Sequence, residues 1–168
     1  MNILRDVPGI ITAEQLTETV TAIAAIQLPD GNIPWTPGEH TDPWNLVEAA
    51  MALDLGGMHH EATSAYEWLR SKQLISGAWH SYYVGDEVKD ETLDTNVTSY
   101  IANGVWHHYL CTGDTAFLER FWVCVEGAID YALSFQSESG EIAWRGDIPA
   151  DGALLTGSSS IHASLRNA

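Results

Sequence analysis

Apolar residues recur along this chain with the three-to-four-residue spacing of amphipathic helices, and polar stretches rich in glycine and proline separate them. Capping signals mark several helix starts. Thr12 with Gln15 forms a capping box, Asp42 stands before Pro43, and Asp114 follows a glycine. The pattern predicts six helices, near 13–27, 42–55, 59–72, 94–112, 114–133, and from Ser158 onward.

Three copies of one short motif separate the predicted helical hairpins. In each copy a glutamine is followed four residues later by a glycine and soon after by a tryptophan. The copies are Gln27/Gly31/Trp35, Gln73/Gly77/Trp79 and Gln136/Gly140/Trp144. Self-similarity of this kind indicates a repeat whose single unit cannot bury its apolar face, so the hairpins must stack or close into a ring.

The glutamine and the glycine of the motif have a structural explanation. A glutamine at a helix end can bond the exposed backbone of the next turn, and a glycine there permits a left-handed turn. We therefore expect both residues to hold the hairpins together. Functional side chains are expected among the tryptophans and the polar residues that follow them.

Composition narrows the possible partners. The chain has 168 residues, 45% of them hydrophobic, and its 23 acidic against 7 basic side chains give a net charge of −16. Such a charge repels nucleic acid and anionic membranes. No stretch reaches the ~18 apolar residues of a membrane span, and no signal peptide is visible, so we expect a cytoplasmic protein. Cys111 and Cys124 are then expected to be reduced.

Four sequence segments carry a resemblance to a known superfamily. They are Gly38-Glu-His40-Thr-Asp42-Pro-Trp44, Asp94-Thr-Asn96, Gly104-Val-Trp106-His-His-Tyr109 and Gly140-Glu-Ile-Ala-Trp144. Together with the repeat, they make the chain resemble the α/α toroid superfamily of terpenoid cyclases and protein prenyltransferases, most of all the actinobacterial prenyltransferase-like or squalene-cyclase-like proteins.

The resemblance implies an all-α fold, an α/α toroid in which about six helical hairpins close into a barrel. Residues 1–168 would then form a single domain of about three hairpins, the N-terminal half of the barrel, truncated at the C-terminus. A missing C-terminal half, or a homo-oligomer, would be needed to close the ring.

The resemblance also implies a function, action on an isoprenoid or similar apolar small molecule in an aromatic-lined cavity. A carbocation would be stabilised by the faces of tryptophans and helped by the carboxylates of Asp42 and Asp94. The tryptophans are Trp35, Trp44, Trp79 and Trp144. The acidic D-x-D-D cluster of hydrocarbon cyclases and the zinc ligands of protein prenyltransferases are both absent from the chain.

A second interpretation leads to carbohydrate chemistry. Six-hairpin glycosidases of the glucoamylase-like kind are also α/α barrels, and they place two carboxyl groups beside the scissile bond, among aromatic rings. Asp42 and Asp94 are candidates, as is Glu141 beside Trp144 and Arg145. One of these acids would need a raised pKa to donate a proton. A third interpretation is a scaffold without catalysis, whose centre would be packed with side chains.

Histidines and further acids complete the candidate residues. His40 and His80 fall in the loops that carry the tryptophans, so we expect them near a ligand. The segment from Asp86 to Glu91 is superficially similar to a diphosphate–magnesium motif. We interpret it as an acidic polar loop, and we expect no metal site or cofactor.

Overall fold

The computed structural model describes residues 4–145 and 152–168, so the middle of the third expected loop, 146–151, lies outside the described residues. The described elements are α1 (Ala13–Ile26), α2 (Pro43–Leu55), α3 (His59–Lys72), β1 (Tyr82–Val84), β2 (Glu87–Asp90), α4 (Thr95–Ser99), α5 (Ile101–Thr112), α6 (Thr115–Leu133) and α7 (Leu155–Asn167). Helices dominate, which confirms the all-α prediction.

The predicted helix starts are largely confirmed. The Thr12 hydroxyl accepts the Gln15 N–H at 3.1 Å, and the Gln15 side chain accepts the Thr12 N–H in return at 2.9 Å. The carboxylates of Asp42, Asp94 and Asp114 cap α2, α4 and α6 in the same manner. Local capping chemistry thus fixes where four of the helices begin.

Two predicted boundaries are wrong. The single helix expected over 94–112 is divided at Tyr100, because the N–H of Tyr100 bonds to the Val97 carbonyl and that of Asn103 to the Tyr100 carbonyl, a tighter winding than the α-helix. The last helix begins at Leu155, three residues before Ser158. It has no side-chain cap, so no sequence signal marked its true start.

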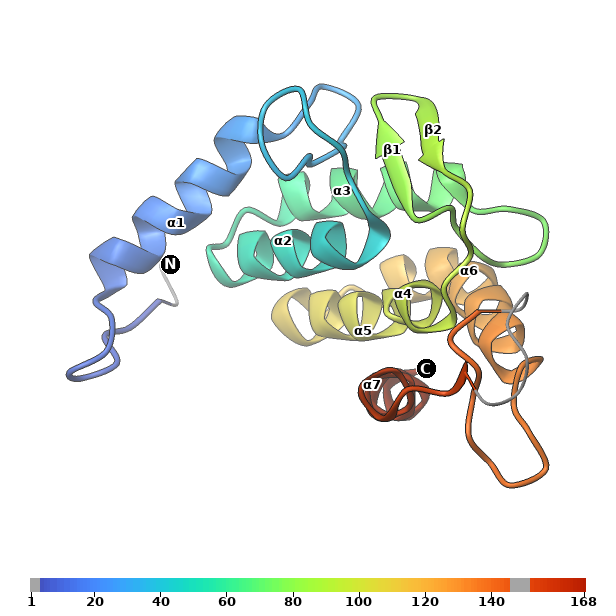
Figure 1. Ribbon diagram of the computed structural model, residues 1–168. Helices are drawn as coiled ribbons and strands as arrows, with labels where there is room; N and C mark the ends of the chain where they lie inside the picture. The colour runs from blue at the N-terminus through green and yellow to red at the C-terminus, as the bar shows by residue number, and fades with distance from the viewer. Residues whose placement is uncertain (1–3, 146–151) are drawn as a thin grey trace.

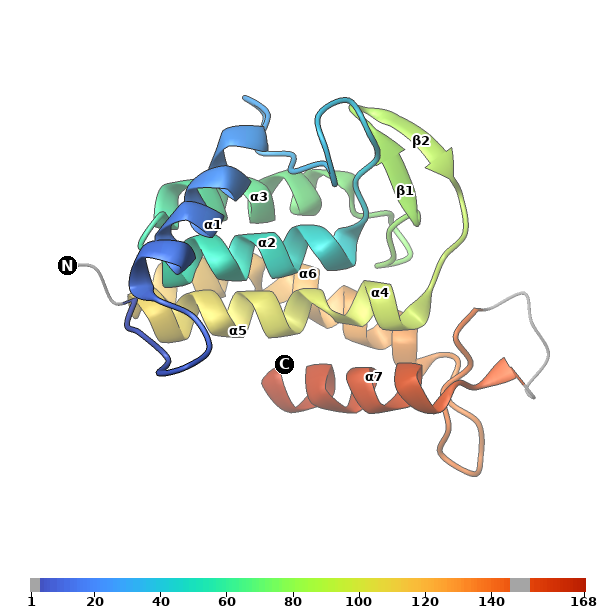
Figure 2. The same ribbon diagram turned by 60° about the vertical axis from the view of Figure 1, so that its left-hand side comes forward.

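The helices form two rows. Helices α2, α4 with α5, and α7 lie side by side in one row, and α3 and α6 pack behind them (Figures 1 and 2). In Figure 2 the starts of α2, α4 and α7 all lie at the right-hand end of the molecule, and the hairpin of β1 and β2 lies at the same end, above α4. The loops that carry the repeated motif therefore gather at one end of the helices.

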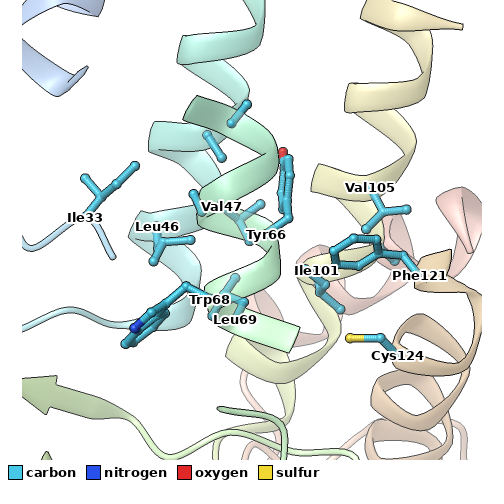
Figure 3. Packing of buried hydrophobic residues seen from close by; sticks show 14 of the residues in the cluster. Ile33, Leu46, Val47, Tyr66, Trp68, Leu69, Ile101, Val105, Phe121 and Cys124 are labelled. Carbon is cyan, nitrogen blue, oxygen red and sulfur yellow. The ribbon is translucent and has the colours of Figure 1, made fainter. Parts of the chain in front are cut away.

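An apolar core joins α2 and α5 to α3 and α6, and a second, smaller cluster of Ala132, Ile142 and Ile161 packs α7 against α6. Figure 3 shows the side chains of α2, α3, α5 and α6 that meet in the larger core, with Tyr66 of α3 near the middle. The ring of Tyr66 packs edge-on against Phe117 and Phe121 at centroid distances of 5.6 and 6.3 Å. Gly104 allows this close packing, because a Cβ there would lie 2.6 Å from Val47 and 2.7 Å from Tyr66.

Two of the three motif glutamines connect their own turn to the next hairpin, whereas Gln136 donates within its own turn to the Gly140 carbonyl at 2.9 Å. The Gln27 side-chain amide donates to the carbonyls of Gly31 and Glu61 at 3.0 and 2.9 Å. Gln73 donates in the same way to Gly77 and Cys124 at 2.9 and 2.8 Å. Two structurally equivalent bonds show that the hairpins are linked as repeats.

Gly77 should be sensitive to substitution for two reasons. Its φ is +91°, and a Cβ would stand 2.0 Å from the Gly127 carbonyl oxygen of α6. We expect Gly77→Ala to reduce the free energy of unfolding by roughly 3 kcal/mol in urea titrations. Gly38→Ala is the matched control, since Gly38 has a φ of +83° with nothing within 4 Å of the Cβ position, and it should cost roughly 1 kcal/mol. Equal losses in both variants would contradict the steric argument.

A buried hydrogen-bonded cluster links α2 to α5 at the end of the molecule away from the loops. Asp54 is 0% exposed, and its carboxylate lies 2.9 Å from Nδ1 of the buried His108 and 3.0 Å from Nδ1 of His59. Burial, followed by the negative charge of Asp54, raises the pKa of Tyr66 well above its usual value. The cluster therefore connects α2 to α5 through hydrogen bonds to a buried carboxyl group.

Candidate functional site

A cavity of about 490 Å³ opens at the end of the molecule where the loops gather. It lies at the N-terminal ends of α2 and α4, between the β1–β2 hairpin and the segment before residue 146. Six of the residues singled out in the sequence line it: Trp35, Asp42, Trp44, Asp94, Trp144 and Arg145. The cavity thus brings together residues of all three motif loops.

Backbone pairing between successive loops builds the cavity. Thr41, just before α2, exchanges both backbone hydrogen bonds with Tyr83 of the second loop, at 2.8 and 2.9 Å. At the start of α4, Thr95 donates from its N–H to the Trp144 carbonyl at 2.9 Å and from its hydroxyl to the Ala143 carbonyl at 2.8 Å. Each loop therefore fixes the edge of the loop before it.

The position relative to the motif glycine decides which side chains reach the cavity. Two residues after the glycine the side chain is buried in every loop, at Ile33, Trp79 and Ile142. Four residues after it, the side chain lines the cavity in every loop, at Trp35, Ser81 and Trp144. The second loop has its tryptophan two positions earlier than the others, so that ring belongs to the core.

Asp42 is a fully hydrogen-bonded carboxylate at the cavity wall. One oxygen accepts the Asn45 backbone N–H at 2.9 Å. The other accepts the Trp35 indole N–H at 2.6 Å and the Asn45 side-chain amide at 2.8 Å. The residue is only 6% exposed. These three donors fix the orientation of the carboxylate at the cavity wall.

Asp94 has a different environment. Burial raises the pKa of its carboxyl above the usual value, against the opposing effects of the Val97 and Asn96 N–H groups and the positive charge of Arg145. The Val97 N–H donates to Asp94 at 2.9 Å. A carboxyl that retains its proton at higher pH than usual and lines a cavity has the property that a general acid requires.

Aromatic rings form a second feature of the wall. Trp35 is 52% exposed, although its indole N–H is bound to Asp42. Its ring packs against His40, and the other side of His40 meets Tyr82, with both centroid distances 4.5 Å. Trp44 stacks on Tyr100 at 4.5 Å and 18°. The cavity therefore presents large, well-supported ring surfaces.

Three predicted site residues lie elsewhere. Trp79 is buried and donates its indole N–H to the Leu69 carbonyl at 2.7 Å, so it cannot reach a ligand. His80 points its Nδ1 to the Glu91 carbonyl at 3.1 Å. Glu141 is held at the surface by the Ser139 hydroxyl at 2.9 Å. None of the three lines the cavity, and His40 supports the wall by contacting Trp35 and Tyr82.

The β1–β2 hairpin was missed in the sequence and contributes four lining residues, Ser81, Tyr82, Asp90 and Thr92. The segment had been interpreted as an acidic polar loop. Gly85 and Asp86 between two short strands with aromatic or branched residues are a hairpin signal that could have revealed it. Gly85 adopts a φ of +57°, as such a turn requires.

Acidic residues of the hairpin do not gather around a common point. Asp86 pairs with Lys72 at 2.5 Å, whereas Asp90 faces the cavity. Within residues 4–145 and 152–168 no three His, Cys, Asp or Glu side chains are arranged to hold a metal ion. In the same described ranges no helix is long and apolar enough to cross a membrane.

Comparison with known structures defines the fold class. The chain superimposes on the family 8 endoglucanase Cel10 of Klebsiella pneumoniae with a TM-score of 0.59 and 14% identity, over 77% of this chain and 42% of that one. At this identity the likeness concerns the fold. It confirms the α/α toroid prediction, with the architecture found in family 8 glycosyl hydrolases.

Sequence relatives point in the same direction. Over 162 residues the chain is 44% identical to the MMP endo-(1,4)-3-O-methyl-alpha-D-mannosidase of Mycolicibacterium hassiacum, covering 95% of this chain and 45% of that protein. Over 91 residues it is 32% identical to an uncharacterized glycosyl hydrolase of Methanocaldococcus jannaschii, covering 51% of this chain and 15% of the relative. The chain thus spans less than half the length of these curated relatives. No protein-family model matches it.

These relatives overturn the resemblance to terpenoid cyclases and protein prenyltransferases. Both are glycosyl hydrolases, so the prenyltransferase, transferase and isoprenoid interpretations are wrong. The error has a structural cause, because the motif glutamines and glycines form the turns that link toroid hairpins and report on no particular chemistry. The relatives support the alternative interpretation, a six-hairpin glycoside hydrolase.

Proposed function

We propose that this chain is part of a glycoside hydrolase and that the cavity at the ends of α2 and α4 binds its carbohydrate substrate. The observation that carries the proposal is the meeting of Asp42 and Asp94 with exposed aromatic rings in one cavity. Two carboxyl groups are the usual catalytic equipment for glycosidic hydrolysis, and aromatic rings suit the apolar faces of sugars. The 44% identical relative, a mannosidase, supports this choice over other toroid activities.

The two carboxyl groups suit different roles. Asp94, with its raised pKa, would protonate the oxygen of the leaving sugar. Asp42, whose carboxylate is oriented by three donors, would stabilise the positive charge that develops on the sugar ring. If a carboxyl group from the rest of a closed ring stabilised this charge instead, Asp42 would serve mainly as the N-cap of α2.

The substrate we propose is a 1,4-linked α-mannoside, with 3-O-methylated units among the first to be tested. This follows from the activity of the 44% identical mannosidase, whose similarity covers 95% of this chain. A partly methylated glycan is more apolar than an ordinary one. Such a substrate agrees with the ring surfaces of Trp35 and Trp44 in the cavity.

Closure of the ring belongs to the same proposal. The relatives contain more than twice the length matched here. We infer that further hairpins, from the same protein or from a second copy, complete the barrel around the cavity. The cytoplasmic location expected from the sequence stays a prediction.

Digestion of defined oligosaccharides tests the proposed function. We expect the full-length protein to release shorter products from α-(1→4)-linked mannose oligosaccharides or from their 3-O-methylated forms, detected by mass spectrometry. If both the unmethylated and the methylated oligosaccharides are cleaved, the site accepts a sugar with or without the methyl group. Binding without cleavage would overturn the hydrolase assignment and favour a carbohydrate-binding protein. If the protein showed no binding and no cleavage of these oligosaccharides, the carbohydrate assignment itself would be overturned.

The indole N–H of Trp35 gives a more specific prediction. Trp35→Phe keeps an aromatic ring but loses the 2.6 Å hydrogen bond to Asp42. Because a hydrogen bond to a charged group contributes about 1.5–3 kcal/mol, we expect kcat to fall about tenfold or more while KM changes little. Trp122→Phe, at a tryptophan outside the cavity, is the control. A rise in KM alone would show that Trp35 acts through its ring and does not orient Asp42.

A further inference from the structure

We propose that the β1–β2 hairpin forms a sugar subsite in which the Asp90 carboxylate accepts hydroxyl groups of one sugar unit and the Tyr82 ring covers its apolar face. This inference rests on the proposed function and adds the residues that select the substrate. Tyr82 was not among the candidates from the sequence, and Asp90 was considered there only as part of the acidic segment 86–91. Both line the cavity that holds Asp42 and Asp94.

The strand register places Tyr82 and Asp90 together. They are direct partners across the antiparallel hairpin, and the register shifts between Tyr82 and Tyr83. Such a bulge redirects a side chain relative to its neighbour. Tyr83 is accordingly buried against Trp68 at 5.5 Å, whereas Tyr82 remains 36% exposed at the cavity.

Asp90 is prepared to accept hydrogen bonds. Its Oδ1 accepts the Thr92 N–H at 2.8 Å. Hydrogen bonds from the Thr92 side chain and backbone, together with the more distant charges of Arg145 and His80, lower the pKa of Asp90. The group is therefore ionised at neutral pH, and an ionised carboxylate can only accept. A ligand that meets it must bring donors, as sugar hydroxyls do.

The Tyr82 ring is supported from behind. His40 packs against it edge-on at 4.5 Å and 69°, and Trp35 packs against the far side of His40. This row of three rings connects the hairpin to the first motif loop. Tyr82 is thereby held in place before a ligand arrives, which lowers the entropy cost of binding.

The charges around the cavity favour a neutral polyhydroxyl ligand. Among the described lining residues, Asp42, Asp90 and Asp94 are acidic and Arg145 is basic. The three acids disfavour an anion such as a phosphate. The guanidinium near Asp90 and Asp94 disfavours a cation held between them. The carboxylates instead offer acceptors and the arginine offers donors, and a sugar hydroxyl can both donate and accept a hydrogen bond.

Binding measurements test the subsite separately from catalysis. The full-length protein with Asp94→Asn serves as the inactive parent, and α-(1→4)-mannotetraose is titrated by calorimetry. We expect Asp90→Asn to weaken binding about tenfold, because a charged acceptor is replaced by a neutral one. Tyr82→Leu should weaken it to a similar degree and Tyr82→Phe by less than about twofold. Glu87→Gln, on the same hairpin but outside the cavity, is the control and should bind as the parent does.

Each outcome has a definite meaning. The Asn side chain can still accept the Thr92 N–H. If Asp90 served only to hold the hairpin in shape, Asp90→Asn would therefore keep the affinity for the oligosaccharide and only Asp90→Ala would lose it. Unchanged affinity in Asp90→Asn would therefore overturn the subsite while leaving the proposed function intact. If the parent bound neither mannotetraose nor its 3-O-methylated form, both the subsite and the proposed function would be overturned. Weakening in Asp90→Asn and Tyr82→Leu, with Glu87→Gln unaffected, would support the subsite.

Discussion

Asp94→Asn should abolish most of the activity of the full-length protein without weakening its fold. Asn cannot donate a proton to a leaving sugar, so we expect kcat to fall about 10²–10⁴-fold on a mannose oligosaccharide. It can still cap α4, because its side-chain oxygen accepts the Val97 N–H as the carboxylate does. The combination of lost turnover and retained stability would separate catalysis from capping.

The pH dependence of stability checks the same residue. The folded-state pKa of Asp94 is raised by burial. Its contribution to stability is therefore present below the unfolded pKa of about 3.9 and is lost as pH rises through the folded value. At pH 7 the ionised carboxylate is the unfavourable form. Asp94→Asn should consequently unfold at the same or a higher urea concentration than the parent at pH 7. A clear loss of stability there would contradict the raised pKa.

The second large effect concerns Asp54, in the core. Asp54→Ala leaves the buried His108 and the half-exposed His59 without their common acceptor. Leaving a buried hydrogen-bonding group without its partner typically costs about 1–3 kcal/mol, so we expect a loss of about that size in the free energy of unfolding at pH 7. Urea titration followed by circular dichroism measures it.

Two further variants make the Asp54 prediction specific. Asp54→Asn keeps one acceptor oxygen on a side chain of similar size, so its free energy of unfolding should fall less than that of Asp54→Ala. Asp130→Ala removes an exposed acid from α6 and should change stability by less than about 0.5 kcal/mol. If Asp54→Ala and Asp130→Ala were equally stable, the cluster would have no role in joining α2 to α5.

The features predicted correctly from the sequence depend on interactions between residues that are close together in the chain. A cap such as Asp42 with Pro43, or the box formed by Thr12 and Gln15, depends only on neighbouring residues, and both were recognised. The role of Gln73 was also predictable, because its turn lies within four residues of it. These local rules identified the all-α repeat.

The function was harder to predict because the conspicuous motif is structural. All three motif tryptophans were candidates for the site. Trp79 stands two residues after its glycine and is buried, whereas Trp144 stands four residues after its glycine and lines the cavity. Counting from Gly77 would have placed Ser81 at the cavity. Asp94 could be named as a cap from the sequence, but its raised pKa depends on burial, which only the folded structure provides.

The hydrogen bonds between successive loops have a practical consequence for protein engineering. Thr41 uses both its backbone groups to hold Tyr83, and the N–H of Thr95 is taken up by the Trp144 carbonyl. A grafted loop that follows a different backbone path would leave an edge of its neighbour unpaired. Libraries that aim to change glycan preference should therefore exchange adjacent loops as pairs, cutting within the helices, where each donor has its partner on the same element.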